Sequence, residues 1–268
     1  MSDPVLVADR LTRRFGGLTA NQDVSLALEQ GRLHALLGPN GAGKSTCLNL
    51  LSGELAPSAG RILFGGRDIT GLDAHRRSRA GIGRSFQRSN IFHRFTVLEN
   101  CRLAAQARAP RPWRVFNDAS RRLDLLQRAH AAIEQVGLIG RADRVAGALS
   151  HGEQRQLEIA MVLATDARVL LLDEPLAGMG SDESMQMVEL LRKLRATHAI
   201  LLVEHDMSAV FELADVITVM VDGQVLESGP PEQIRGSAAV RLAYLGHDIG
   251  DDAAPDVHAQ PRSGVRDG

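Results

Sequence analysis

The chain has 268 residues, of which 44% are hydrophobic, so it can bury the core of one large domain or of two small ones. Its formal net charge of −1 gives no overall electrostatic field that would favour binding to nucleic acid or to a membrane surface. Its two cysteines suit a reducing compartment. No run approaches the roughly 18 apolar residues of a membrane span, and Met1-Ser2-Asp3-Pro4 lacks the basic and apolar regions of a signal peptide. We therefore expect a soluble cytosolic protein.

Short strands are predicted in the first third of the chain, where apolar or alternating runs are separated by glycines. They cover residues 5–11, 24–28, 33–37 and 62–64. The strand at 33–37 leads directly into Gly38-Pro39-Asn40-Gly41-Ala42-Gly43-Lys44-Ser45, which fits the phosphate-loop pattern G-x-x-x-x-G-K-S/T. A helical pattern that begins at Thr46 follows the loop. A strand, this loop and a helix in that order predict a nucleotide-binding site over residues 38–46.

The residue types of this loop fit the binding of phosphates. Backbone N–H groups must wrap around an anion, and a Cβ in place of the glycine hydrogens would obstruct them. The helix that follows would direct the positive end of its dipole at the phosphates. Lys44 would reach the β- and γ-phosphates, and Ser45 would offer its hydroxyl to Mg²⁺. The structural alternative is a glycine-rich turn between a strand and a helix, with an incidental lysine.

The rest of the chain predicts an α/β fold. Residues 96–136 have a helical pattern that is broken at 110–112, and after Ser150 helices and strands alternate. Helices are predicted at about 152–163, 181–195 and 207–213, and strands at 169–172, 200–203, 216–221 and 224–227. Such alternation predicts a parallel sheet with helices on its faces. We expect residues 88–147 to form a separate helical lobe, and the polar stretch from 250 onward to be disordered.

The strand at 169–172 ends in two carboxylates, Asp173 and Glu174. In a parallel sheet, ligands bind at the carboxyl ends of the strands, which here is beside the phosphate loop. Asp173 can then hold Mg²⁺, directly or through water, while Glu174 lies where it can polarise an attacking water. The structural alternative is a solvated Asp-Glu turn, and the nearby phosphate loop favours the functional interpretation.

The segment Leu149-Ser150-His151-Gly152-Glu153-Gln154 precedes a predicted helix. A serine followed three residues later by a glutamate is also an ordinary capping box. Together with the phosphate loop, the Asp173-Glu174 pair and His205, however, this segment resembles the ABC-type ATPase cassettes, whose signature motif is LSGGQ. The resemblance covers about residues 5–246.

That resemblance implies an α/β fold of the P-loop ABC ATPase type. The core sheet would be mostly parallel, with an N-terminal antiparallel β-subdomain and an inserted α-helical lobe. The ATPase domain would cover residues 1–249, the lobe 88–147, and a disordered tail 250–268. ATP and Mg²⁺ would be the cofactors.

The resemblance also implies roles for single residues. Phe15 would stack on adenine, and a core phenylalanine is the structural alternative. Gln87 would contact Mg²⁺ and the attacking water, and His205 would face the γ-phosphate. Ser150 and Gly152 would contact the γ-phosphate of ATP bound to the opposite subunit. The active site is therefore expected to be complete only in a dimer.

Three positions depart from the family pattern. His151 stands in place of the first glycine of LSGGQ, Glu153 in place of its glutamine, and Gly180 where aspartate is usual. These departures put the geometry of the dimer interface in question, but not ATP binding.

Within the family, several stretches resemble the ATP-binding subunits of branched-chain (hydrophobic) amino acid uptake transporters, namely residues 14–18, 84–87, 154–160 and 240–246. ATPases of urea or amide importers are close relatives, and the lipopolysaccharide-export ATPase shares the ending at 244–246, so both remain alternatives. The implied partners are transmembrane permease subunits, a second ATPase subunit in a homo- or heterodimer and, indirectly, a periplasmic substrate-binding protein, but no nucleic acid. The implied location is peripheral, on the cytoplasmic face of the inner membrane.

Other classes of ATPase fit less well. A translation-associated ABC protein would carry two cassettes, whereas the phosphate loop occurs once. A chromosome-maintenance ATPase would insert a long coiled coil before the signature, and a small-molecule kinase would lack the signature.

The motifs leave one charge asymmetry unexplained, since thirteen arginines and three acids between His75 and Arg128 give that stretch about +10. We expect part of this arginine set to help seat the ATPase under its permease, the alternative being a solvated face paired with acids elsewhere.

Overall fold

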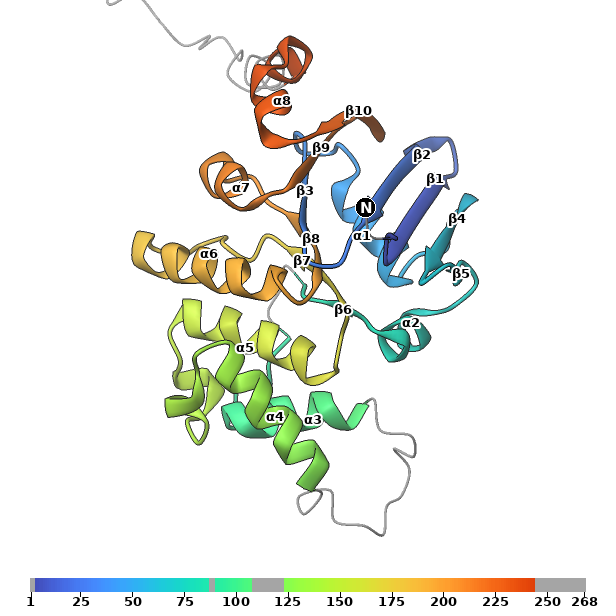
Figure 1. Ribbon diagram of the computed structural model, residues 1–268. Coiled ribbons are helices and arrows are strands. Elements are labelled where there is room, and N and C mark those ends of the chain that lie inside the picture. The colour runs from blue at the N-terminus through green and yellow to red at the C-terminus, as the bar shows by residue number, and fades with distance from the viewer. Residues whose placement is uncertain (1–2, 87–89, 108–122, 244–268) are drawn as a thin grey trace, which may run out of the picture.

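A computed structural model describes residues 3–86, 90–107 and 123–243 of the chain. Within them the strands form two sheets (Figure 1). The smaller sheet is antiparallel, with the strand order β2-β1-β4-β5. Its strands are β1 Leu6–Phe15, β2 Leu18–Leu28, β4 Ala59–Phe64 and β5 Arg67–Asp68.

The larger sheet has the strand order β10-β9-β3-β8-β7-β6. All its neighbouring strands are parallel except β10, which pairs antiparallel with β9 at one edge. Its strands are β3 Leu33–Leu37, β6 Ile82–Arg84, β7 Val169–Asp173, β8 Ala199–Val203, β9 Val216–Val221 and β10 Gln224–Gly229. This arrangement confirms the expected fold class, a mostly parallel core sheet with an antiparallel N-terminal sheet.

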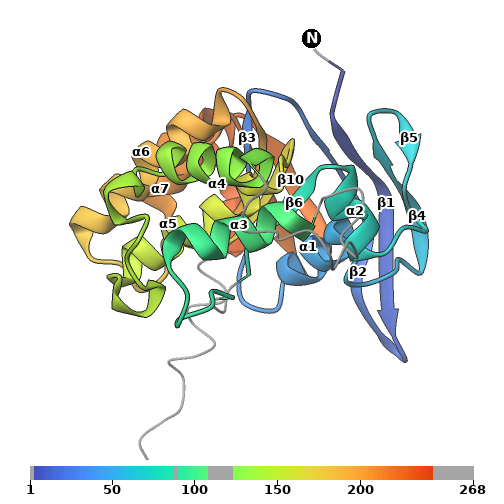
Figure 2. The same ribbon diagram turned by 90° about the horizontal axis from the view of Figure 1, so that it is seen from below.

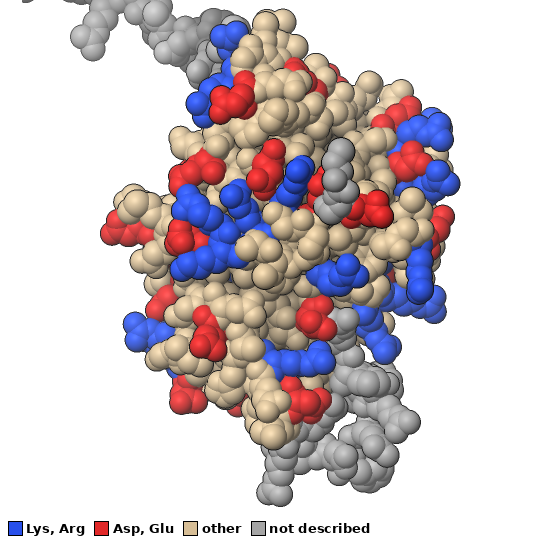
Figure 3. Space-filling model, in the orientation of Figure 1, with Lys and Arg blue, Asp and Glu red and all other residues tan. Residues whose placement is uncertain are grey.

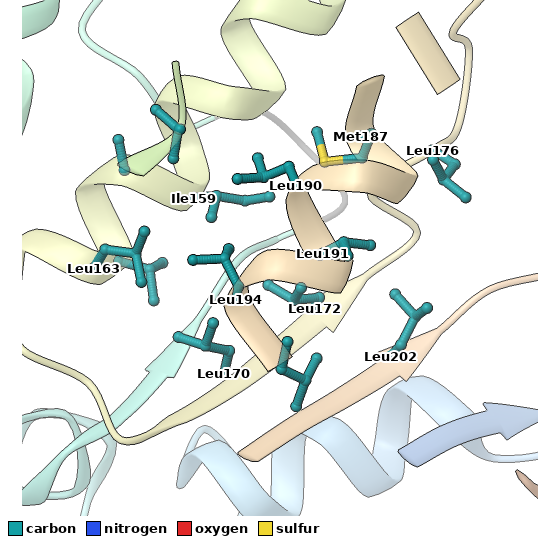
Figure 4. Close-up of a cluster of buried hydrophobic side chains, with 14 of the residues drawn as sticks. Ile159, Leu163, Leu170, Leu172, Leu176, Met187, Leu190, Leu191, Leu194 and Leu202 are labelled. Carbon is teal, nitrogen blue, oxygen red and sulfur yellow. The ribbon is translucent and has the colours of Figure 1, made fainter. Parts of the chain in front are cut away.

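The central strands β3, β7 and β8 are buried at every position because both faces of the larger sheet are covered. Alternate side chains point to opposite faces. Leu170, Leu172 and Leu202 face α5 (His151–Ala164) and α6 (Ser181–Arg195), as Figure 4 shows. Leu171 and Leu201 face α1 (Lys44–Ser52), which lies between the two sheets. The helices on both faces of the sheet therefore explain why these central strands have nearly continuous apolar sequences.

Two further helices, α3 (Val97–Ala107) and α4 (Leu123–Gln135), pack against α5. They lie away from the antiparallel sheet in both views (Figures 1 and 2). Their buried side chains, among them Cys101 and Ile133, belong to the same apolar cluster as the strands that face α5. The limits predicted for a helical lobe and for a disordered tail stay predictions, since residues 108–122 and 244–268 lie outside the described residues.

The remaining helices are short: α2 Ala74–Ala80, α7 Met207–Leu213 and α8 Pro231–Gly236, with 3-10 turns at Ile139–Arg141 and Ala146–Ala148. Sequence patterns predicted α6, α7, β3 and β9 with their observed limits, but did not predict α2 or β6. Neither has a strong pattern, because α2 carries few apolar residues and β6 has three residues. None of the helices in the described part of the chain is both long and apolar enough to cross a membrane.

Candidate functional site

Three chain segments that carry predicted site residues emerge at one edge of the larger sheet. The strand register aligns Leu36 of β3 and Asp173 of β7 with Val203 of β8. The phosphate loop, Glu174 and the Glu204-His205 pair therefore leave the sheet side by side, at the carboxyl ends of parallel strands. Ligands bind at this edge in open α/β sheets.

Close backbone packing explains two glycines of the phosphate loop. Gly38 has φ 150°, and a Cβ on it would lie 2.2 Å from Met220 O. Gly43, the N-cap of α1, has φ 94°, and its Cβ would lie 2.5 Å from Ala20 O. Both contacts are too short for any residue with a side chain, so only glycine lets the loop curl around an anion here.

The outer side of the phosphate loop is held by residues from β2 and from the β9–β10 turn. The buried Asn21 donates from Nδ2 to Gly43 O at 3.2 Å. The backbone N–H of Gly223 donates to Ala42 O at 3.2 Å, and Gly223 O accepts from Gln22 N at 2.8 Å. These bonds leave the inner side of the loop open toward the start of α1, where helix N–H groups point outward.

Lys44 lies folded over the loop. Its Nζ donates to Gly38 O at 2.7 Å and to Pro39 O at 3.0 Å. Burial lowers the pKa of Lys44, and the nearby carboxylates of Glu174 and Asp173 partly oppose that shift. The ammonium group is thus held at the mouth of a cradle of N–H groups, where a polyphosphate can replace the two carbonyl acceptors.

A pocket of about 610 Å³ joins this cradle to an aromatic side chain. Phe15 lines one part of it and is 43% exposed, with the Arg13 guanidinium 4.6 Å from the ring centroid. Lys44 and Glu174 line another part. The other lining residues are Leu18, Thr19, Ala20, Asn40, Gly41, Ala42, Gly43, Ser45, Thr46, Asp222 and Gly223. An exposed ring near a phosphate cradle fits a nucleotide, with the base at the ring and the phosphates at the loop.

Asp173 ends β7 and is 6% exposed. Burial raises its pKa, and the Arg84 guanidinium, whose Nη2 lies 3.6 Å from Asp173 Oδ2, acts in the opposite direction. Within the described residues no three His, Cys, Asp or Glu side chains gather as a metal cluster. Mg²⁺ does not require one, because one carboxylate, one hydroxyl such as that of Ser45, waters and phosphate oxygens suit it. The donor types of Asp173 and Ser45 therefore fit Mg²⁺.

Glu174 follows directly and has an unusual backbone. Its φ is 50°, in the left-handed region that residues with a Cβ seldom adopt, and its N–H donates to Val203 O at 2.9 Å. Such conformations cluster at functional sites, where neighbouring structure holds them in place. Here the bond to β8 fixes the backbone, and the side chain lines the nucleotide pocket.

Beside it, Glu204 is buried and His205 is exposed. Glu204 accepts from Leu176 N at 2.8 Å and from His205 N at 3.2 Å, while burial raises its pKa. The imidazole Nδ1 of His205 lies 3.9 Å from Glu204 Oε2. His205 is at the same sheet edge but does not line the pocket, and Gln87 lies outside the described residues.

Ser150 and Gly152 lie elsewhere, at the start of α5. Ser150 is its N-cap and forms the predicted capping box with Glu153, so the structural interpretation of this serine is confirmed. Neither Ser150 nor Gly152 lines the nucleotide pocket. Both donate instead to the carboxylate of Glu183 in the first turn of α6.

Sequence reasoning missed several residues that shape the site: Asn21, Arg84, Glu183, Glu204 and the turn Asp222-Gly223. Most of them act across long sequence separations, as Arg84 does on Asp173, and no local pattern marks such contacts. The turn could have been found, because an Asp-Gly pair between two strands is a hairpin signal.

Comparisons with known proteins agree with this geometry. The ABC transporter family profile matches residues 21–177. The chain is 40% identical over 253 residues to the high-affinity branched-chain amino acid transport ATP-binding protein BraF of Pseudomonas aeruginosa, covering 92% of this chain and 99% of that protein. It is also 40% identical, with the same coverage, to LivG of Escherichia coli strain K12, which carries the same description.

Among solved structures, the ADP conformation of MJ1267, an ATP-binding cassette of an ABC transporter, superposes with a TM-score of 0.82. It is 27% identical and covers 91% of this chain and all of that one. A nucleotide-free cassette of an ABC transporter gives a TM-score of 0.80 at 27% identity, over 90% and 98% of the two chains. The chain therefore belongs to the ABC transporter family, as one of its ATP-binding and ATP-hydrolysing cassettes.

Proposed function

We propose that this chain powers an importer for branched-chain or other hydrophobic amino acids. The observation that carries the substrate class is the match to BraF and LivG, since it runs over 99% of each of those proteins and includes the helical segment as well as the shared motifs. The nucleotide pocket supports the ATPase role independently, through the phosphate loop, Lys44 and Glu174.

The positions of the described side chains support catalytic roles within one subunit, and the role of Gln87 rests on the family resemblance alone. The N–H groups of residues 38–46 and the ammonium of Lys44 bind the phosphates, and Phe15 stacks on adenine. Glu174 orients the attacking water and accepts its proton, while His205 turns toward the γ-phosphate from the same sheet edge. Ser45, Asp173 and Gln87 would hold Mg²⁺, which neutralises charge on the phosphate oxygens when it is bound.

The site is completed by a second ATPase subunit. Ser150 and Gly152 lie outside the pocket of their own chain, yet their hydroxyl and N–H groups form an anion-binding helix start. In the proposed dimer they contact the γ-phosphate held by the opposite subunit. The dimer would bind permease subunits at the cytoplasmic face of the membrane and receive substrate indirectly through a periplasmic binding protein.

Reconstitution in proteoliposomes tests the proposal. The chain is assembled with the permease subunits and the second ATPase from its own gene neighbourhood, and uptake of radiolabelled leucine is measured with the binding protein outside and ATP inside. Leucine uptake and stimulated ATP hydrolysis are expected, and both should fall to background with Lys44→Ala. Stimulation by urea or an amide without any by leucine, or transport in the outward direction, would contradict the proposed substrate class.

A further inference from the structure

The carboxylate of Glu183 occupies the anion-binding face of the signature segment. Its Oε1 accepts from Ser150 Oγ at 2.8 Å and from Gly152 N at 3.1 Å. An ideal Cβ on Gly152 would lie 2.7 Å from the Glu183 carboxyl carbon, so the carboxylate lies directly against the glycine. An oxygen that accepts hydrogen bonds from both a hydroxyl and a backbone N–H at the start of a helix is bound as a phosphate oxygen would be.

Several groups stabilise Glu183 in this position. Hydrogen bonds from Ser150, then from the N–H groups of Gly152 and Gly180, lower the pKa of Glu183, so it is ionised at neutral pH. Gly180 is the N-cap of α6, and the carboxylate therefore joins the starts of two helices, α5 and α6. Negative charge is favoured at the N-terminus of each of these helices, where the helix dipole is positive.

A second contact ties the same two segments together. The His151 Nε2 lies 3.2 Å from Ala177 O, in the loop between Glu174 and α6. A Cβ on Gly178 of that loop would lie 3.3 Å from the same nitrogen. The histidine that departs from the family signature thus links the signature to the loop that follows Glu174.

We infer that Glu183 is a built-in competitor for the γ-phosphate at the signature, so that it opposes pairing of the subunits until ATP displaces it. This inference rests on the proposed function, in which Ser150 and Gly152 grip the γ-phosphate of the opposite subunit. The same two donors cannot serve a carboxylate and a phosphate oxygen at once. If the carboxylate stayed, its charge would repel the phosphate a few ångströms away. Glu183 must turn out toward solvent when the dimer closes, and the bonds it gives up weaken the dimer.

The test measures ATP-dependent association of the full-length chain in a Glu174→Gln background, which removes the proposed base and so prevents turnover. Glu183→Gln keeps the size of the side chain and removes its charge, and Glu183→Ala removes the competitor altogether. Asp182→Asn is the matched control, since it removes one charge from the same turn of α6 at an exposed position. Light scattering reports the dimer fraction over a titration with ATP.

Both Glu183 variants should lower the ATP concentration at half-maximal dimer by about three- to tenfold, while Asp182→Asn leaves it unchanged. The direction of the change distinguishes this role from a purely structural one. If Glu183 only held α5 and α6 together, its replacement would weaken dimer formation or abolish it. Unchanged or weaker association of both Glu183 variants would overturn the inference. Binding of a fluorescent ATP analogue to the monomer is measured in the same samples, and its absence would contradict the proposed function instead.

Discussion

At the scale of single residues, the nucleotide pocket depends on contacts that position its side chains before any ligand arrives. Phe15 is half-exposed, and one face of its ring carries the Arg13 guanidinium at 4.6 Å, while Arg13 Nη1 donates to Ala56 O at 2.7 Å. The ring is thus supported on one side and available to a base on the other. Its exposure and its place in the pocket argue against a core role and support the proposed stacking on adenine.

Phe15→Ala should weaken ATP binding by about 1–2 kcal/mol, the usual range for loss of one base-stacking side chain. Phe15→Trp should retain affinity, because a larger ring keeps the stacking face. Calorimetric titration measures both. The control is inorganic tripolyphosphate, which has no base, and its affinity should not change in Phe15→Ala. An equal loss for both ligands would mean that the substitution disturbed the loop and not a base contact.

At the scale of elements, the larger sheet and its two layers could be predicted, whereas the contacts between elements could not. The strand at Leu33–Leu37 and the helix at Ser181–Arg195 have continuous or periodic apolar patterns, and both occur with the predicted limits. The phosphate loop and the Asp173-Glu174 pair were recognisable because each motif is contiguous. Glu183 was not, since only the folded chain brings α6 beside Ser150.

Arg77 of α2 illustrates such a hidden contact. Sequence reasoning counted it among the basic residues of 75–128, but it is 1% exposed. Its guanidinium donates to Leu50 O at 2.5 Å, Leu51 O at 3.0 Å, Thr70 O at 2.8 Å and Leu72 O at 2.9 Å. Two of these carbonyls belong to the last turn of α1, where helix carbonyls have no partner within the helix. Arg77 is therefore a structural cap and not a docking residue.

Arg77→Met should lower the free energy of unfolding by about 3 kcal/mol, because it leaves several buried carbonyls without a donor. Arg79→Met on the same helix is the matched control, since Arg79 is exposed and its replacement should change stability by less than about 0.5 kcal/mol. Urea denaturation followed by circular dichroism gives both values. Equal stability of the two variants would refute the capping role of Arg77.

Another buried polar group makes stability depend on pH. His34 in β3 contacts Thr218 Oγ1 of β9 from Nε2 at 2.7 Å, and Nδ1 lies 3.3 Å from Ala27 O of β2. Burial lowers its pKa from 6.5 to about 4. The unfolded chain therefore takes up a proton at a higher pH than the folded chain does. The stability that the neutral ring provides is present above pH 6.5 and is lost as the pH falls toward 4.

Between pH 7 and pH 5 this single group should reduce the free energy of unfolding by about 2 kcal/mol. His34→Gln should have lower stability at pH 7 but a flatter pH dependence, since glutamine does not titrate. Urea denaturation of both proteins at the two pH values measures the difference. Parallel pH profiles of wild type and variant would show that another group is responsible.

At the scale of the whole molecule, the fold pairs some arginines of the basic stretch at 75–128 with acids outside that stretch. Arg84 pairs with Asp173, Arg76 with Asp73 and Arg128 with Asp166, so the alternative of internal pairing holds for part of the arginine set. Basic and acidic side chains are interspersed on the face drawn in Figure 3. Arg79 and Arg94 remain exposed within 75–128, whereas Arg121 and Arg122 lie outside the described residues.

The exposed arginines can be tested for a role in seating the ATPase under its permease. The double variant Arg79→Glu/Arg94→Glu should weaken co-purification with the permease and make it more sensitive to salt, because each substitution reverses a charge that would face permease acids or lipid phosphates in the proposed complex. Arg10→Glu/Arg32→Glu, exposed outside this stretch, is the control. ATP binding by the isolated chain should be the same in all three proteins. Unaltered assembly at low and high salt would leave these arginines as an ordinary solvated surface.

The most direct test of the account is single-turnover hydrolysis of ATP by the Glu174→Gln variant, because Glu174 is the residue on which the proposed chemistry depends. The variant should bind ATP with wild-type affinity, release no phosphate above background, and accumulate as a nucleotide-bound dimer in light scattering. Lys44→Ala should differ by losing ATP binding itself, since it removes a charge from the phosphates. Phosphate release by Glu174→Gln at the wild-type rate would contradict the assignment of Glu174 as the base.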